Sequence, residues 1–173
     1  MYYGAIKSHD IANGPGVRVS LFVSGCRNRC EGCFQPETWS FCYGKPFTEE
    51  SEQELTAHLA RPYIAGLTLL GGEPMEPENQ AALLPLLRRI RERFPEKSVW
   101  AFTGYTLEAL LTDGVHPHTE NTLPLLSLID VLVDGRYERE RRNLTLRFRG
   151  SENQRLLDLP ASLAAGCAVL LEK

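Results

Sequence analysis

Residues 25–34 read GCRNRCEGCF and place three of the chain's five cysteines, Cys26, Cys30 and Cys33, close together. Their spacing, C-x3-C-x2-C, would rarely arise if five cysteines were scattered at random along the chain. An odd total and this crowding fit poorly with a disulfide framework, which small secreted domains build from even numbers of spaced cysteines. The segment therefore predicts a metal or cluster site.

Two kinds of site are open at this point. Structural zinc usually takes four ligands, often from two C-x2-C pairs. This chain has no second pair, so a zinc site would need His58 or Cys42 as its fourth ligand. Iron–sulfur clusters are held by cysteine thiolates, commonly four. Three thiolates on a four-iron cluster would leave one iron without a protein ligand, and an open position is typical of catalysis. The cysteines favour a catalytic iron–sulfur cluster over a zinc-binding interaction module.

Strands and helices alternate outward from the cysteines. The apolar and β-branched pattern predicts strands over residues 17–24, 64–70, 98–103 and 129–133. Helical spacing predicts helices over residues 48–59, 78–94, 106–111 and 123–128. Further strands are predicted over residues 144–148 and 168–171. Strands that alternate with helices imply right-handed βαβ units and a parallel sheet.

The length of 173 residues predicts a single α/β domain over residues 1–173. A complete eight-fold barrel takes about 250 residues, so we expect an incomplete, open (β/α) barrel. Ligands gather at the carboxyl ends of the strands in such sheets. The cysteine loop, the GGEP segment at residues 71–74 and Thr103-Gly104 each follow a predicted strand, which predicts that they meet at one site.

Composition limits the classes of partner. Lys and Arg number 19 against 22 Asp and Glu, a formal net charge of −3 that argues against a broad electrostatic surface for nucleic acid. No apolar run approaches the roughly 20 residues that span a bilayer. The start of the chain lacks the features of a signal peptide. We therefore expect a cytoplasmic protein with no nucleic-acid or membrane partner.

The motifs together resemble a known family. The cysteine spacing followed by GGEP resembles the radical S-adenosylmethionine superfamily, and NGPGVR at residues 13–18 is similar to a stretch of its glycyl-radical activating enzymes. The segments TGYT at 103–106, DVLVDG at 130–135 and RGSENQ at 149–154 resemble the enzymes that activate anaerobic ribonucleotide reductase. The resemblance covers roughly residues 5 to 157.

The resemblance implies a specific reaction. The three thiolates would hold a [4Fe-4S] cluster whose open iron binds the amino and carboxylate groups of S-adenosylmethionine. One electron would cleave the sulfonium, and the 5′-deoxyadenosyl radical would remove a hydrogen from a glycine in the reductase's large subunit. The potential required lies at the low end of the range of iron–sulfur clusters. The electron would come from flavodoxin or a ferredoxin-type donor.

The resemblance also implies residue roles. The backbone of Gly71, Gly72, Glu73 and Pro74 would hold the methionyl ammonium, because glycines permit a close approach to a ligand. Gly32 stands where many relatives carry an aromatic residue, so Phe34 is expected to face the adenine. The remaining expected cofactor-binding residues are Thr103, Gly104, Asp134 and Arg18.

Several of these residues also have a purely structural interpretation. Arg18 could be a solvated charge at a strand end, and Asp134 could belong to an Asp-Gly turn. Asn13 replaces the family's commoner Asp, so this position carries no charge here. The charge run YERERR at 137–142 is either solvated surface or a docking site for the reductase.

A second enzyme class is also open. Radical S-adenosylmethionine enzymes that act on a small molecule, such as deazapurine-forming synthases, include short chains of this type. A glycine-centred radical in the reductase would indicate the first function, and a modified small product would indicate the second.

Overall fold

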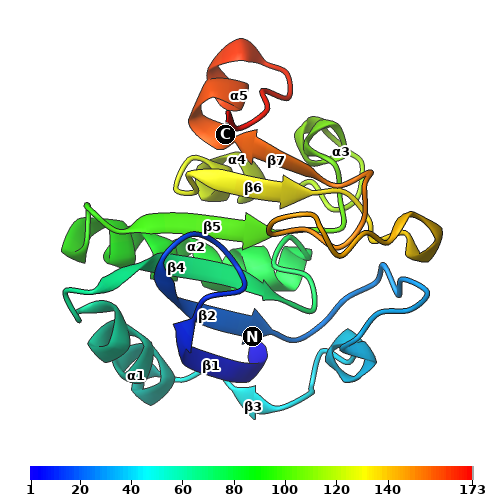
Figure 1. Ribbon diagram of the computed structural model, residues 1–173. Helices are drawn as coiled ribbons and strands as arrows, with labels where there is room; N and C mark the ends of the chain where they lie inside the picture. Colours follow the sequence, from blue (N-terminus) through cyan, green and yellow to red (C-terminus); the bar gives the residue numbers. More distant parts are fainter. Residues whose placement is uncertain (173) are drawn as a thin grey trace.

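The computed structural model describes residues 1–172, and within them the strands form one sheet in the order β3-β1-β2-β4-β5-β6-β7. The central strands β2, β4, β5 and β6 are parallel, whereas β1, β3 and β7 join antiparallel at the two edges. In Figure 1 the sheet runs from β3 at the bottom to β7 near the top. The chain therefore has a mixed α/β fold with an open, mostly parallel sheet. The predicted domain end, Lys173, lies outside the described residues.

The bounds of the elements follow the sequence pattern closely in the parallel part. The strands are β1 (Tyr2–Asp10), β2 (Val17–Val23), β3 (Lys45–Pro46), β4 (Ile64–Gly71), β5 (Ser98–Phe102), β6 (Val131–Asp134) and β7 (Arg155–Asp158). The α-helices are α1 (Glu49–Leu59), α2 (Pro77–Arg93), α3 (Leu107–Leu111), α4 (Thr122–Leu126) and α5 (Leu159–Ala165). Short 3-10 helices are η1 (Pro36–Trp39) and η2 (Arg139–Arg141). The four predicted parallel strands and four predicted helices are confirmed with small shifts at their ends.

Two predicted strands are wrong. Residues 144–148 form a loop in which Phe148 takes a positive φ of 59°, a conformation that an extended strand does not contain. Residues 168–171 make one isolated bridge, Leu157 with Leu170. The edge strands β1, β3 and β7 were not predicted from the pattern, and β1 pairs with β2 through two register irregularities.

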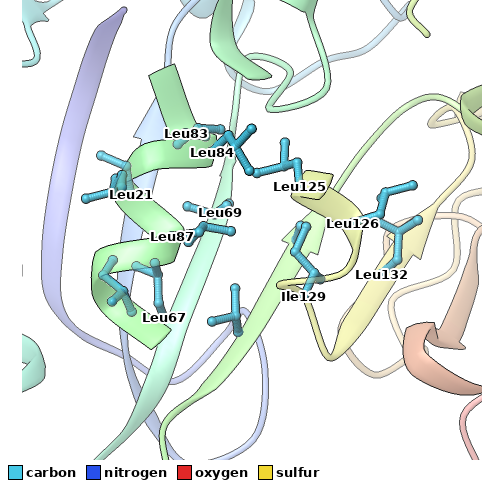
Figure 2. Packing of buried hydrophobic residues seen from close by; sticks show 14 of the residues in the cluster. Leu21, Leu67, Leu69, Leu83, Leu84, Leu87, Leu125, Leu126, Ile129 and Leu132 are labelled. Carbon is cyan, nitrogen blue, oxygen red and sulfur yellow. The ribbon is translucent and has the colours of Figure 1, made fainter. Parts of the chain in front are cut away.

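One face of the sheet carries the main core. Leucines of α2 and α4 pack on the side chains of β2, β4 and β6 that point to this face (Figure 2). Alternate residues of β5 point the other way, so Val99 and Ala101 join this core while Trp100 belongs to a smaller cluster on the opposite face. Each fully buried leucine contributes about 1.5–3 kcal/mol. This packing fixes the strands whose carboxyl ends carry the site.

The helices are capped and bounded by local sequence. Thr48 precedes α1 and its backbone N–H donates to Ser51 Oγ at 3.3 Å, a capping box. Pro85 lies inside α2 on an exposed face, well past the first turn, where the carbonyl that lacks its N–H partner can bond to water. Within residues 1–172, no helix has the length and apolar character needed to cross a membrane.

Candidate functional site

The cysteine loop leaves the carboxyl end of β2 and is fixed by its backbone. Gly25 N–H donates to Thr38 O at 2.8 Å, and Cys26 N–H donates to Trp39 O at 3.2 Å. Cys33 N–H donates to Cys30 O at 3.2 Å and closes a turn between the last two cysteines. Cys26 is buried, whereas Cys30 and Cys33 are partly exposed. All three line one cavity of about 610 Å³.

The GGEP loop leaves the neighbouring strand β4 and lies directly against the cysteine loop. Gly72 N–H donates to Val23 O at 2.7 Å. Gly71 has a φ of 108°, and a Cβ there would lie 2.7 Å from the same carbonyl oxygen. A Cβ on Gly72 would lie 2.7 Å from Gly25 O. Both positions therefore require glycine, because the two loops leave no room for a side chain.

The Glu73 carboxylate joins three loops. It accepts hydrogen bonds from Asn28 Nδ2 at 3.0 Å, from Gly104 N–H at 2.7 Å and from Met75 N–H at 2.9 Å. Its side chain is buried, and burial raises the pKa of Glu73 to about 7 while the N–H donors of Met75 and Gly104 act in the opposite direction. One side chain thus ties the cysteine loop to the segments that follow β4 and β5.

A second buried carboxylate, Glu76, holds the residue after the first cysteine. It accepts from the backbone N–H of Arg27 at 2.7 Å and from the Arg27 guanidinium at 2.5 Å. Tyr105 Oη–H donates to the same carboxylate at 3.1 Å, and burial raises the pKa of Tyr105. His116 Nε2 lies 3.4 Å from Glu76 Oε2. The cysteine loop is therefore anchored on two sides by glutamates.

Arg18 does not line the cavity, which corrects the expectation that it binds cofactor directly. It is fully buried at the opposite end of β2, and its Nε–H donates to Thr68 Oγ1 at 2.7 Å. Thr68 Oγ1–H in turn donates to Asn13 O at 2.8 Å, and Asn13 lines the cavity. A Cβ on Gly14 would lie 2.7 Å from Arg18 Cδ. Arg18 therefore supports the NGPG loop from beneath.

Arg18 is a buried charge rather than a solvated one, and it has no ion-pair partner within residues 1–172. Burial lowers its pKa to about 10, and it remains a cation at neutral pH. Its other donors meet Leu67 O at 2.8 Å, Ser98 O at 3.0 Å and Ser98 Oγ at 2.9 Å. The indole of Trp100 lies 5.5 Å from the guanidinium. These contacts satisfy a buried charge with neutral oxygens and an aromatic face.

Asp134 also lies away from the cavity lining. It is fully buried, accepts from Leu107 N–H at 2.8 Å, and accepts from Arg155 at 2.9 and 2.5 Å. Arg155 also binds Glu108 at 2.8 Å and lowers the pKa of Glu108 to about 2. The Asp134 carboxylate thus fixes the start of α3 to the strand pair β6–β7, a structural arrangement that differs from the expected contact with cofactor.

The other expected residues are brought together, with one exception. Phe34, Thr103, Gly104, Gly71, Gly72 and Glu73 line the same cavity as the cysteines, whereas Pro74 is buried outside its lining. The Phe34 side chain is 88% exposed. Residues not singled out as cofactor-binding also line this cavity: Asn28, Gln35, Phe102, Tyr137, Leu144 and Gln154. Gln154 belongs to the quoted RGSENQ motif, but a lone Asn28 or Gln35 carries no signal in the sequence.

The donor set fits an iron–sulfur cluster. A four-iron cluster places its ligands on separate irons, so its thiols must surround a cavity rather than meet at one point. Among residues 1–172, no three His, Cys, Asp or Glu side chains converge on a single ion position. His58 and Cys42, the expected fourth zinc ligands, do not line the cavity. Burial and nearby Glu73 raise the pKa of Cys26 to about 11, so binding iron would release its proton.

Comparison with known proteins points to the same class of cofactor. Residues 12–157 match the 4Fe-4S single cluster domain family. The chain is 42% identical over 156 residues to the anaerobic ribonucleoside-triphosphate reductase-activating protein of Enterobacteria phage T4, covering 90% of this chain and 93% of that protein. Its identity to the protein of that name from Pasteurella multocida is 44%, with 89% and 95% covered. For Escherichia coli K12 the identity is 40%, with 89% and 96% covered.

Proposed function

This chain belongs to the anaerobic ribonucleoside-triphosphate reductase-activating proteins, and we propose that Cys26, Cys30 and Cys33 hold its [4Fe-4S] cluster. It is a radical S-adenosylmethionine-type activating enzyme of anaerobic ribonucleotide reductase. The proposal extends to the substrate of the cluster, S-adenosylmethionine, and to the protein that receives the radical, the large subunit of the reductase at its glycyl-radical loop.

One observation carries the proposal. Three thiols from the loop after β2, together with Gly71 and Gly72 at the end of β4, line the same cavity at the carboxyl edge of parallel strands. Ligands bind at this edge in open α/β sheets. The contact between the two loops is direct, through the hydrogen bond from Glu73 N–H to Gly25 O at 2.8 Å. A ligand in the cavity would touch the cluster site and the GGEP backbone together.

Some residues of the cavity would bind the ligand, and others position the loops that hold it. When bound, the cluster supplies the single electron that cleaves the sulfonium and so starts the radical chemistry on the reductase glycine. The Gly71–Gly72 backbone offers carbonyl oxygens to the methionyl ammonium. Phe34, at the cavity rim, offers an apolar face to the adenine. Glu73 holds the three loops at fixed separations, because its carboxylate bonds to each of them.

We interpret the open sheet as an incomplete (β/α) barrel of the radical S-adenosylmethionine type, folded as one domain. Its cavity is bordered by residues of the long β6–β7 connection, not by further βα units. An open side suits a substrate that is a loop of another protein. A flavodoxin or ferredoxin-type protein would supply the electron, since Cys42 and Cys167 are too few to hold a second cluster. The cytoplasm is the compartment that keeps such thiols reduced.

Anaerobic reconstitution tests the proposal. We expect about four irons per chain. The reduced protein should cleave S-adenosylmethionine, and its addition to the reductase should produce a glycine-centred radical. Cleavage with a modified small product and no glycyl radical would indicate a deazapurine-type enzyme instead. A colourless protein that contains zinc and neither iron nor sulfide would overturn the enzyme assignment.

A further inference from the structure

The connection between β6 and β7, residues 135–154, is rich in arginine, and we call it the arginine arm. It carries six arginines against three glutamates in a chain whose formal net charge is −3. Residues along its whole length, from Gly135 to Gln154, line the cavity that holds the three cysteines. Six of the chain's arginines therefore lie on a segment that borders the site.

Hydrogen bonds within the arginine arm give it a defined structure. Arg142 and Ser151 form an antiparallel bridge at its base. Gln154 Oε1 accepts from Gly150 N–H at 2.8 Å and from Ser151 N–H at 3.1 Å, and Arg149 donates to Gln154 O at 2.6 Å. These bonds order the base of the arm, where residues 149–154 lead into β7.

The arm is also tied to the cysteine loop. Arg136 donates to Asn28 O at 2.5 Å, and Arg139 lies 3.4 Å from Glu31. A Cβ on Gly32 would lie 3.3 Å from Arg139 Cδ, so the arm packs directly on this loop. The arm and the cysteine loop therefore form two sides of one cavity entrance.

Apolar side chains project at this entrance. Leu144 is 84% exposed and Phe34 is 88% exposed, one from the arm and one from the cysteine loop, and both line the cavity. Exposed large apolar side chains that gather at one place, rimmed by charge, mark interaction sites. A partner that covers Leu144 must itself present apolar groups.

Two arginines close to Leu144 in the sequence are available to pair with carboxylates of a partner. The guanidinium groups of Arg142 and Arg147 have no carboxylate partner among residues 1–172, and Arg147 lies 5.3 Å from the ring of Phe148. Other arginines of the arm are committed within the chain, to Asn28, Glu31, Glu138 or Gln154. Guanidinium groups pair bidentately with carboxylates, so the free pair selects an acidic partner.

We propose that the tip of the arginine arm, Arg142, Leu144 and Arg147, is the docking surface for the glycine-bearing segment of the reductase. This inference rests on the proposed function. A glycine inside a polypeptide carries neighbours on both sides, and these must cross the cavity rim when the glycine enters. The entrance defines their chemistry: an apolar side chain over Leu144 and Phe34, and carboxylates against Arg142 in the cavity lining and against Arg147, which is exposed just outside that lining.

Binding of the reconstituted chain to the purified reductase tests this surface. Arg147→Glu and Leu144→Asp are compared with Arg88→Glu, an exposed arginine on α2 outside the cavity lining. At an ionic strength of about 0.05 M, we expect Arg147→Glu to raise Kd roughly tenfold or more and to flatten the salt dependence of binding. Leu144→Asp should also raise Kd, and Arg88→Glu should match the parent.

Cleavage of S-adenosylmethionine without reductase separates docking from chemistry. Arg147→Glu should cleave at the parent rate while yielding less glycyl radical. If both arm variants bind the reductase as well as Arg88→Glu does, the surface is wrong and the proposed function stands. If the parent itself neither binds the reductase nor radicalises it, the proposed function fails and this inference fails with it. A change confined to self-association would assign the surface to a second copy of the chain and overturn the inference.

Discussion

At the scale of single residues, the site depends on charges that the fold has buried and then satisfied. Glu73 holds the cysteine loop through the Asn28 side chain, and Glu76 holds it through the Arg27 main-chain N–H. Arg18 holds the NGPG loop through Thr68. None of these three partners could be assigned from the sequence, because the bonds of Glu73 to Asn28, Glu76 to Arg27 and Arg18 to Thr68 span 45, 49 and 50 residues. The cysteines and glycines were predictable because their spacing and their steric freedom are local properties.

Glu73→Gln tests the first of these charges. Both carboxylate oxygens of Glu73 accept hydrogen bonds from N–H donors, and a glutamine would present its own NH₂ to some of them. We expect the variant to unfold about 1–3 kcal/mol more easily. Urea denaturation of the apo chain measures this loss, and an unchanged midpoint would contradict the role of Glu73 as a clamp.

The raised pKa of Glu73 also determines whether its contribution to folding stability rises or falls with pH. Because burial raises the pKa of Glu73 to about 7, the folded chain binds more protons than the unfolded chain between roughly pH 4.5 and 7. The contribution of Glu73 to stability is therefore greatest below this window and decreases as pH rises through it. Denaturation of parent and Glu73→Gln at pH 5 and 8 should show a flatter profile in the variant, and parallel profiles would contradict the assignment.

Arg18→Met tests the support beneath the NGPG loop. The substitution keeps an apolar stem but leaves Thr68, Leu67 O and Ser98 O without their donor. We expect a loss of about 2 kcal/mol or more in the free energy of unfolding. Arg88→Met on the exposed face of α2 is the matched control and should change stability by less than about 0.5 kcal/mol. Equal melting temperatures for the two variants would show that Arg18 does not stabilise the fold.

At the scale of elements, the parallel strands were predictable and the edges were not. β2 and β4 are buried along most of their length because both of their faces are covered, and their sequences are accordingly rich in apolar residues. β1 pairs irregularly at an edge, and residues 144–148 have strand-like composition but belong to the arginine arm. Composition describes burial, and it does not distinguish an edge strand from a loop packed on the cavity.

Arg155→Met tests how α3 is joined to the strand pair β6–β7. It leaves the fully buried Asp134 without its cation, and breaking a buried pair in this way costs about 3–5 kcal/mol. Glu108→Gln removes only the exposed partner of Arg155, so we expect a change of about 1 kcal/mol or less. Thermal unfolding of both variants distinguishes the two bonds, and similar losses would contradict the dominant role of Asp134.

The ion pair between Glu108 and Arg155 should also make the stability of the folded chain sensitive to acid pH. Arg155 lowers the pKa of Glu108 to about 2, so the stabilisation from this pair is present above roughly pH 4.5 and is lost as pH falls toward 2. Glu108→Gln should remove that part of the acid sensitivity. Acid titration of the folded fraction measures it, and an identical titration in parent and variant would contradict the pairing.

At the scale of the whole molecule, three segments distant in sequence form one cavity because parallel strands end at one edge of the sheet. Cys26→Ala, Cys30→Ala and Cys33→Ala should each abolish S-adenosylmethionine cleavage while the chain remains folded. Cys42→Ala is the control: Cys42 is exposed and does not line the cavity, so iron content and cleavage should match the parent. Normal cleavage by any of the first three would remove that thiol from the ligand set.

The central claim is that the cluster keeps one iron free of protein ligands and offers it to S-adenosylmethionine. Electron–nuclear double resonance on the reduced, reconstituted chain tests it directly, with S-adenosylmethionine labelled by ¹⁵N at the amino group. The account predicts a hyperfine coupling from this nitrogen that disappears when the ligand is omitted. A cluster signal that is unchanged by the ligand and shows no ¹⁵N coupling would contradict it.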